Sequence, residues 1–263
     1  MPTYPYARAV TAVDVLMFTV PDFWTTLRSS EPRLEVALLE RTTEPFLGQL
    51  ALPGTIVRVE ADAEGRFDAS DFDAARRVMS DKMRIRPTHL EQLYTWFTRS
   101  WDPRGPTTVI SYFAVVPFDH FRKVDREILT FHPVDDLPKL AFKHNDIVHK
   151  AVERVRGKAM YSSLPALLMP ECFTLRELKS MYEAVLGRTT EAERMDLPNF
   201  SRKVAELGIL ELVENDLPAA AAARKRTAAT GRKPQIYRLT DRKLRTFERT
   251  AFDAKPIRIQ GTS

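Results

Sequence analysis

The sequence contains a single cysteine, Cys172, among its 263 residues. One cysteine cannot form an intramolecular disulfide, which excludes a disulfide-stapled scaffold and favours an intracellular setting. The chain also lacks a long hydrophobic run. Its apolar N-terminal stretch, residues 10–20, is short and interrupted by Asp14, so it predicts a buried strand, and neither a membrane span nor a secretory signal. We therefore expect a cytoplasmic protein with no membrane partner.

Clusters of metal ligands are missing as well. Of the five histidines, only His144 and His149 are close in sequence. Their five-residue spacing does not align them on one face of a helix. Cys172 has no histidine or cysteine nearby and is interpreted as structural. These observations predict no metal site and no cofactor.

Charge is distributed unevenly along the chain. Up to Ala141 there are 17 Lys and Arg residues against 20 Asp and Glu, whereas from Phe142 onward there are 23 against 15. Residues 224–249 alone hold 10 basic and 2 acidic residues. An acidic first part and a basic second part suggest that only the second part meets a polyanion.

The first part reads as a mixed domain. Apolar or alternating segments predict strands, and Phe72, Ala75, Met79 and Met83 form an apolar stripe on a helix. A further helix begins at Asn145 or Asp146 and ends near Gly157. We place the domain boundary around Leu140, which gives an α+β domain over residues 1–140 and a second domain over residues 141–263. The expected strands are residues 13–20, 34–41, 90–98 and 107–116, and the expected helix is residues 71–84.

Two helix signals follow one another in the second domain. Thr174 and Glu177 form a capping box, and Gly187 ends the helix that it begins. After a polar connection, Asp196 and Pro198 begin a second helix, which Gly208 ends. Its apolar side chains are Phe200, Val204 and Leu207, and its opposite face carries Asn199, Arg202, Lys203 and Glu206. Such a face suits the major groove of DNA. Considered alone, however, a helix of this kind is more often an ordinary amphipathic helix whose charged face is exposed to solvent.

The segments after these helices favour DNA binding. Residues 209–213 and 235–239 predict two strands, and the alanine-rich and basic stretch between them predicts a long, flexible hairpin tip. Helix, helix, strand, basic loop, strand is the order of a winged helix-turn-helix. The predicted DNA-binding residues are Asn199, Ser201, Arg202, Lys203, Arg224, Lys225, Arg226, Arg232 and Lys233.

The first domain resembles a Nudix domain. Residues 52–55 (Leu-Pro-Gly-Thr) are similar to the opening of the Nudix signature, and residues 77–85 stand where its Arg-Glu-x-x-Glu-Glu helix would be. The intervening loop, residues 61–76, is longer than in the signature. Val78, Asp81 and Lys82 occupy the three positions whose carboxylates hold Mg²⁺ in Nudix enzymes. Because a lysine repels a cation and a valine cannot ligate one, we expect no hydrolase activity.

The same substitutions are compatible with a pocket that binds phosphate without metal. The candidate effector-binding residues are Arg41, Arg58, Arg77, Lys82 and Arg104. Taken one at a time, each arginine is more simply explained as a surface residue. Trp96 and Trp101 are interpreted as core or rim residues and not as a base-stacking pair.

The second domain resembles a narrower group, the Nudix-related transcriptional regulators of the NrtR family. The similarity lies in residues 142–158, 173–178, 182–187, 199–203, 207–210, 231–234 and 236–239. It implies a Nudix-like α/β/α sandwich followed by a winged helix-turn-helix. It also implies a homodimer that regulates genes of NAD metabolism or sugar utilisation, with a nucleotide or phosphosugar such as ADP-ribose as effector.

The resulting interpretation is a transcriptional regulator, with repression favoured, which binds a palindromic operator in double-stranded DNA. Two alternatives belong to other functional classes. One is a Nudix hydrolase of nucleoside diphosphate derivatives with an accessory basic domain, which the missing carboxylates disfavour. The other is a protein-binding scaffold, which the Asn-Arg-Lys helix face and the basic loop disfavour.

Overall fold

The computed structural model describes residues 8–21, 32–124, 129–213, 218–226 and 234–246, which divide into two compact units. Residues 8–21 and 33–154 form the first unit; Pro32 and the described residues from Val155 onward form the second. The division falls inside helix α2 (His144–Ala159), beyond the boundary expected near Leu140. Most of α2 belongs to the first unit, and Arg154, its last residue there, reaches Glu91 of the same unit, with 3.3 Å between guanidinium nitrogen and carboxylate oxygen.

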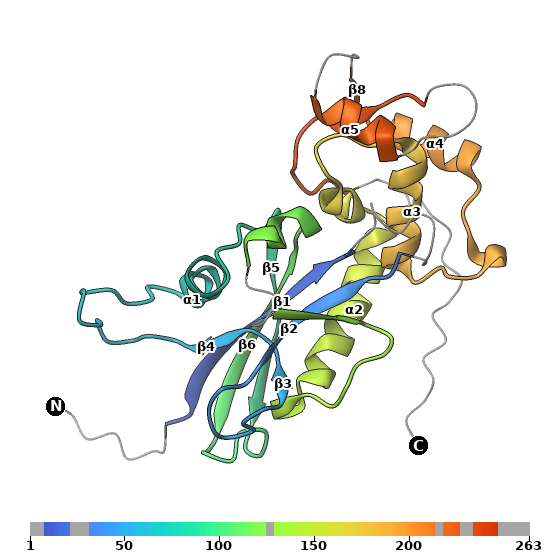
Figure 1. Ribbon diagram of the computed structural model, residues 1–263. Coiled ribbons are helices and arrows are strands. Elements are labelled where there is room, and N and C mark those ends of the chain that lie inside the picture. Colours follow the sequence, from blue (N-terminus) through green and yellow to red (C-terminus); the bar gives the residue numbers. More distant parts are fainter. Residues whose placement is uncertain (1–7, 22–31, 125–128, 214–217, 227–233, 247–263) are drawn as a thin grey trace. The chain divides into compact units, whose positions relative to one another are not determined.

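A mixed seven-stranded sheet forms the first unit (Figure 1). At its centre β1 (Val10–Thr19) and β6 (Thr107–Val115) run parallel, and the other pairings are antiparallel. The main path is β3-β2-β1-β6-β5, with β4 paired to β1 and β7 to β2. The four strands expected from apolar patterning are confirmed. The remaining bounds are β2 Glu35–Glu40, β3 Leu50–Ala51, β4 Gly54–Ile56, β5 His89–Thr98 and β7 Leu129–Pro133.

Helices lie against both faces of this sheet, as expected for an α/β/α sandwich (Figure 1). Val13 and Val15 of β1 share one core with Ala74, Ala75 and Met79. Because successive strand residues point to opposite faces, Asp14 faces the other side, where it meets the start of α2. The expected helix over residues 71–84 is present as α1 (Asp71–Arg77) and a wider π-helical continuation, η1 (Val78–Lys82). Two short 3-10 turns, η2 (Phe118–Lys123) and η3 (Ala141–Lys143), complete the unit.

The second unit contains the two predicted helices. In α3 (Leu175–Leu186), Thr174 and Glu177 make both hydrogen bonds of the capping box, and Gly187 ends the helix in the left-handed conformation. In α4 (Leu197–Glu206), the side chain of Asp196 accepts a hydrogen bond from the backbone of Asn199. The short turns η4 (Leu164–Leu168) and η5 (Glu191–Glu193) lie before α3 and between α3 and α4. The helix-turn-helix interpretation is therefore confirmed.

The wing differs from the expectation. Strands β8 (Leu210–Leu212) and β9 (Tyr237–Leu239) pair as an antiparallel hairpin, but the alanine-rich stretch between them is not a loose tip. It forms helix α5 (Pro218–Arg226). Ala220 and Ala223 are fully buried in a small core with Cys172 and Ile236. Alanine has the highest helix propensity, and its small side chain allows α5 to approach the wing closely.

Among the described residues, no helix is both long and apolar enough to cross a membrane.

Candidate functional site

A pocket of about 350 Å³ opens in the first unit where strands β1, β2, β4 and β6 meet the start of α2. Two of the five arginine and lysine residues expected to bind an effector, Arg41 and Arg104, line it. Arg41 follows β2, and Arg104 lies in the turn between β5 and β6. Segments far apart in the sequence thus bring two guanidinium groups to one cavity.

Arg41 is held without a salt bridge to any carboxylate in the part of the chain that the structure describes. Its Nε donates to the carbonyl of Pro45 at 2.7 Å, and its Nη2 donates to the carbonyl of Thr43 at 3.1 Å. The guanidinium carbon also lies 4.7 Å from the ring centroid of Phe142. Partial burial, and then the charge of Arg104, hold the pKa of Arg41 below its usual value. Arg41 remains a cation, and an anion bound between the two arginines would relieve their repulsion.

Arg104 is better neutralised. Its guanidinium forms a fork on Asp102, with nitrogen–oxygen distances of 2.7 to 3.2 Å. This hydrogen bonding raises the pKa of Arg104 and lowers the pKa of Asp102. The side chain of Arg104 is 57% exposed, so its guanidinium remains accessible to a phosphate.

Flat aromatic surfaces and carboxylates complete the pocket. Trp101 and Phe142 lie in its wall, and so do Glu40 and Asp14. Trp101 was expected to be a core or rim residue; it is half-buried, with its ring centroid 5.4 Å from that of Trp96. Asp14 and Phe142 also line the pocket, although neither was expected there from the sequence. No local motif identifies them, because only the tertiary fold brings them together.

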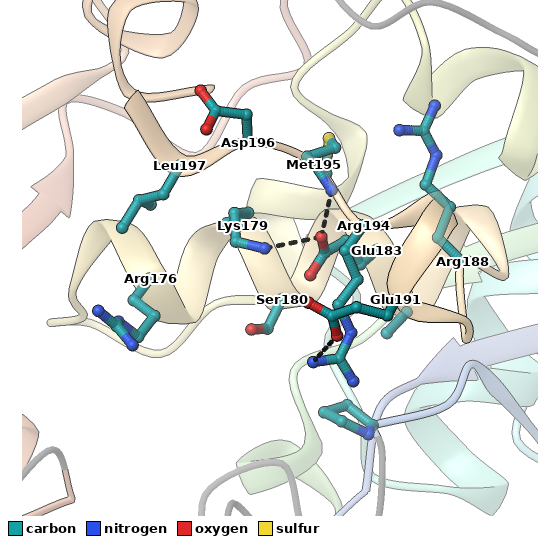
Figure 2. Close-up of a pocket in the computed structure, with 12 residues that line it drawn as sticks. Arg176, Lys179, Ser180, Glu183, Arg188, Glu191, Arg194, Met195, Asp196 and Leu197 are labelled. Carbon is teal, nitrogen blue, oxygen red and sulfur yellow. Dashed lines mark hydrogen bonds and ion pairs between the residues drawn. The ribbon is translucent and has the colours of Figure 1, made fainter. Parts of the chain in front are cut away.

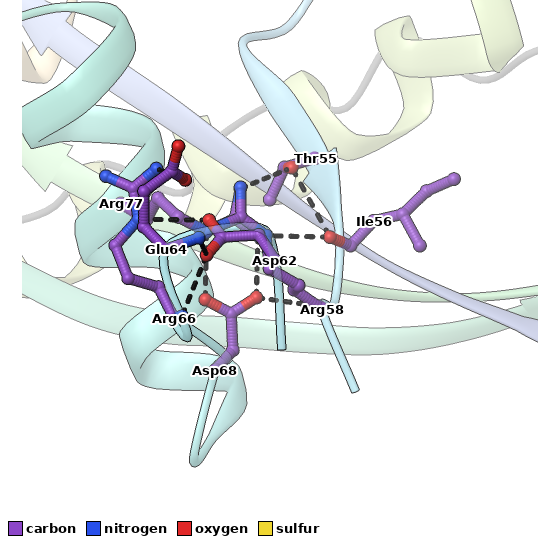
Figure 3. Close-up of polar contacts among 8 residues, drawn as sticks. All are labelled: Thr55, Ile56, Arg58, Asp62, Glu64, Arg66, Asp68 and Arg77. Atoms are coloured by element: carbon purple, nitrogen blue, oxygen red, sulfur yellow. Dashed lines mark hydrogen bonds and ion pairs between the residues drawn. The ribbon is translucent and has the colours of Figure 1, made fainter. Parts of the chain in front are cut away.

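Arg58 and Arg77 do not join this pocket. Figure 3 shows them in a separate polar network that joins β4, the long loop that follows it and the last residue of α1. Arg77 donates to both oxygens of Asp68 at 2.6 and 2.8 Å, to Thr55 Oγ1 at 3.1 Å and to the carbonyl of Ile56 at 3.1 Å. Hydrogen bonding from Arg77 lowers the pKa of Asp68, although burial opposes this. The carboxylate of Asp68 therefore already occupies the position that a phosphate would need.

Arg58 is similarly occupied. Its side chain pairs with Asp62, and its backbone nitrogen donates to Asp68 at 2.7 Å. Asp62 also accepts from the backbone and side chain of Arg66. These bonds order the loop and fasten it to β4. Both arginines, which were expected to bind an effector, are therefore engaged by carboxylates of the loop outside this pocket.

The degenerate Nudix positions differ in their surroundings. Val78 is fully buried in the core beneath α1. Asp81 is exposed and accepts a hydrogen bond from the hydroxyl of Ser80 at 2.7 Å. The side chain of Lys82 lies outside the described part of the structure. Among the described residues, no three His, Cys, Asp or Glu side chains are grouped so that they could hold a metal ion.

Helix α4 presents the predicted DNA-reading face. Phe200 and Val204 are buried, and the ring of Phe200 meets the ring of Tyr182 on α3 at 5.5 Å. Asn199 and Arg202 are exposed on the opposite side. Arg202 donates to Asn199 Oδ1 at 3.0 Å and pairs with Glu206 at 3.3 Å. Ser201 and Lys203 are partly exposed on the same helix.

The basic residues of the wing are described only in part. Arg224, Lys225 and Arg226 form the last positions of α5, but their side chains lie outside the described structure. Arg232 and Lys233 fall outside the described residues altogether. Their DNA contacts stay predictions.

A second cavity, of about 640 Å³, lies between α3 and the connection that leads to α4. Figure 2 shows Glu183 at its centre. Glu183 Oε1 accepts from Lys179 Nζ at 2.7 Å and from the backbone nitrogen of Met195 at 2.6 Å. The second bond fastens Met195, the residue before the Asp196 cap of α4, to α3. No sequence pattern had indicated this role for Glu183.

Comparisons with known proteins agree with this geometry. A family model described as the NrtR DNA-binding winged helix domain matches residues 165–239. The "ADPR responsive transcriptional repressor NtrR" of Acinetobacter baylyi is 30% identical over 211 residues, which cover 78% of this chain and 76% of that protein.

Solved structures of an NrtR protein match this chain over both units. The crystal structure of NrtR from Shewanella oneidensis superposes with a TM-score of 0.66 at 27% identity and covers 88% of this chain and 94% of that one. The structure of the same Shewanella protein with a 27mer DNA gives 0.63 at 26% identity, with coverage of 88% and 93%. The protein thus belongs to the NrtR family of Nudix-related transcriptional regulators.

Proposed function

We propose that this chain is a sequence-specific, DNA-binding transcriptional repressor whose first unit binds ADP-ribose or a related phosphorylated metabolite without cleaving it. One combination carries the proposal. The same chain joins a helix with Asn199 and Arg202 exposed to a pocket that contains Arg41 and Arg104 but no grouped metal ligands among the described residues. The name of the Acinetobacter relative, which responds to ADPR, supports this effector.

The pocket offers a partner for each chemical part of such a ligand. Arg41 and Arg104 can bind a diphosphate through charge-assisted hydrogen bonds. Trp101 and Phe142 provide flat apolar surfaces for a base. Glu40 can accept hydrogen bonds from ribose hydroxyl groups. A free nucleobase or a simple sugar would leave Arg41, which has no salt bridge within the described residues, without an anion, so a phosphorylated ligand is favoured.

Hydrolysis is the weaker proposal. A Nudix reaction needs carboxylates that hold Mg²⁺ against the pyrophosphate. Val78 stands at one of these positions and is buried in the core, and Asp81 is a single carboxylate on a short side chain. The long-loop carboxylate Asp68 is engaged by Arg77. The ligand is therefore retained intact and acts as a signal.

In this proposal the second unit binds DNA as part of a symmetric homodimer. A homodimer with twofold symmetry presents two copies of α4 to the two halves of a palindromic operator. The regulated genes belong to NAD metabolism, in keeping with an ADP-ribose signal. The protein acts in the cytoplasm, where it can reach the chromosome.

Operator binding tests the proposal directly. A pool of random duplexes is selected on the purified full chain, and the enriched sequence is titrated at several salt concentrations. We expect an inverted repeat and strong salt dependence. Addition of ADP-ribose in the presence of a chelator should weaken binding by about 5- to 150-fold. AMP, which lacks the diphosphate, is the control.

Two results would decide against it. If calorimetry detects no binding of ADP-ribose at millimolar concentration, the first unit is better explained as a dimerisation scaffold. If the protein cleaves ADP-ribose or NADH with Mg²⁺ or Mn²⁺ faster than about 0.01 per second, far below the ~1–10³ per second of typical enzymes, the hydrolase alternative gains.

A further inference from the structure

The wall of the effector pocket includes an unusual turn immediately before α2. Phe142 has φ 53° and Lys143 has φ 57°, so two consecutive non-glycine residues adopt the left-handed conformation. This conformation is uncommon for any residue with a side chain and especially for a bulky one such as phenylalanine. We call residues 142 and 143 the left-handed turn. Surrounding contacts must hold it in place.

The ring of Phe142 makes those contacts, and one of its partners is Arg41, the cation proposed to bind the ligand. The ring of Phe46 meets it edge-on at 4.8 Å and 77°, and the imidazole of His144 lies 5.4 Å away. On the pocket side, the guanidinium of Arg41 covers it at 4.7 Å. The same group that would bind a diphosphate therefore also stabilises the left-handed turn.

Arg41 would make stronger hydrogen bonds to an anion than to its present partners. Its two hydrogen bonds go to backbone carbonyls, and no carboxylate within the described residues forms a salt bridge with it. An anion offers stronger, charge-assisted hydrogen bonds than a carbonyl does. A diphosphate that draws Arg41 away from Phe142 removes one of the contacts that hold the turn.

The residue after the turn is fixed to the sheet. His144 is 4% exposed, and its Nδ1 accepts a hydrogen bond from the backbone nitrogen of Leu52 at 2.9 Å. Nδ1 is thus an acceptor, and Nε2 faces Asp14 Oδ2 at 3.3 Å. His144 is also the first residue of α2, which continues from the first unit into the second at Arg154. The pocket, the turn and the helix that joins the units are therefore consecutive parts of one chain segment.

We propose that the left-handed turn at Phe142 and Lys143 couples the pocket to α2, so that a diphosphate bound by Arg41 releases the turn and repositions the start of the helix. This inference rests on the proposed effector function and names its regulatory element. A ligand shifts a conformational equilibrium only when it contacts the two states differently. In this proposal Arg41 supplies that difference, because the bound diphosphate draws its guanidinium away from the ring of Phe142.

Lys143 allows a test that removes none of the side chains lining the pocket, since its own exposed side chain does not line the cavity. Glycine adopts φ near +57° without strain, so Lys143→Gly should stabilise the left-handed turn. Lys143→Ala removes the same charge but keeps a Cβ, and it is the matched control. Calorimetry measures ADP-ribose affinity of the full chain, and fluorescence anisotropy measures operator affinity with and without ADP-ribose.

We expect Lys143→Gly to bind ADP-ribose about fivefold more weakly than Lys143→Ala, in line with the cost of a left-handed residue. Operator affinity without ligand should be equal in the two variants. Lys143→Pro, whose ring fixes φ near −65°, should act oppositely, with tighter ADP-ribose binding and weaker operator binding without ligand.

Two failures are distinguishable. If the parent protein does not bind ADP-ribose, the effector function itself is wrong. If the parent binds ADP-ribose and loses operator affinity, but the glycine, alanine and proline variants share one ADP-ribose affinity, the left-handed turn does not couple the sites.

Discussion

Arg77 and Arg41 lie in the same unit, and the sequence gives both the same expected role, yet their surroundings are opposite. Arg77 is 17% exposed and forks onto the buried carboxylate of Asp68. Within the described residues, Arg41 donates only to backbone carbonyls, and it shares an open pocket with a second arginine, Arg104. A mostly buried arginine on a buried carboxylate stabilises the fold, whereas Arg41, which has no salt bridge within the described residues, is available to an anionic ligand. Burial and partner together decide the role, and both are set by the tertiary structure.

The largest expected difference between Arg77 and Arg41 is in what each contributes to the free energy of unfolding. Asp68→Asn leaves the partly buried guanidinium of Arg77 without its counter-charge and should lower the free energy of unfolding of the first unit by about 3 kcal/mol. Urea unfolding followed by tryptophan fluorescence measures this, because Trp96 and Trp101 both lie in that unit. Glu64→Gln, which alters an exposed pair with Arg66, is the control and should unfold like the parent. Equal stability of both variants would contradict a structural role for Arg77.

The same pair predicts a pH dependence. Hydrogen bonds from Arg77, followed by the backbone donor of Arg58, lower the pKa of Asp68 below the ordinary value of 3.8. The folded state therefore favours the charged carboxylate. Its contribution is fully present above pH 3.8 and is lost as the pH falls through the lower folded pKa. The stability difference between parent and Asp68→Asn should be constant from pH 8 to about 5 and shrink below about 4. A constant difference throughout would rule out this carboxylate as the source.

The next effect is on ligand binding. Arg41→Ala removes a charge-assisted contact to the diphosphate and should weaken ADP-ribose binding by about 2 kcal/mol, or about 30-fold. Arg58→Ala is the matched control, because Arg58 is equally basic but pairs with Asp62 outside the pocket. Its ADP-ribose affinity should match that of the parent within about twofold. If the two variants lose affinity equally in calorimetry, the pocket does not discriminate between the two arginines.

Local signals explain what the sequence could predict. Capping at Thr174, the stop at Gly187 and the apolar face of α4 depend on residues within a few positions of one another, and all three are confirmed. The strands of the first unit follow from apolar patterning in the same way. Such features need no knowledge of the rest of the chain.

Long-range contacts explain what the sequence could not predict. His144 meets Leu52 across 92 positions, so no local pattern places either of them at the pocket. The alanine run of residues 219–223 reads as a flexible stretch until Cys172 and Ile236 are seen to cover its buried side. The carboxylate partners of Arg58 and Arg77 lie on a loop whose course the Nudix signature does not specify.

A further effect concerns an arginine whose partners are exposed. Arg202 pairs with Glu206 and Asn199 on the surface of α4. Exposed ion pairs contribute little to stability, so DNA can recruit Arg202 at small cost. Arg202→Ala should weaken operator binding by roughly 1–3 kcal/mol and relax preference at one base position. Gel shifts against operator variants measure both. Arg176→Ala on α3 is the control: it should preserve base preference, and relaxed preference in both variants would count against α4 as the reader.

The smallest effect should come from an exposed pair whose fork resembles that of Arg77 on Asp68. Arg238 forks onto Glu211 across β8 and β9 at 2.9 and 3.0 Å, and both side chains are more than 40% exposed. The hydrogen bonds lower the pKa of Glu211, but water can replace either partner. The melting temperature of Arg238→Ala, measured by circular dichroism, should therefore equal that of the parent within the scatter of replicate scans. A loss as large as that of Asp68→Asn would mean that fork geometry, and not burial, decides what an arginine contributes.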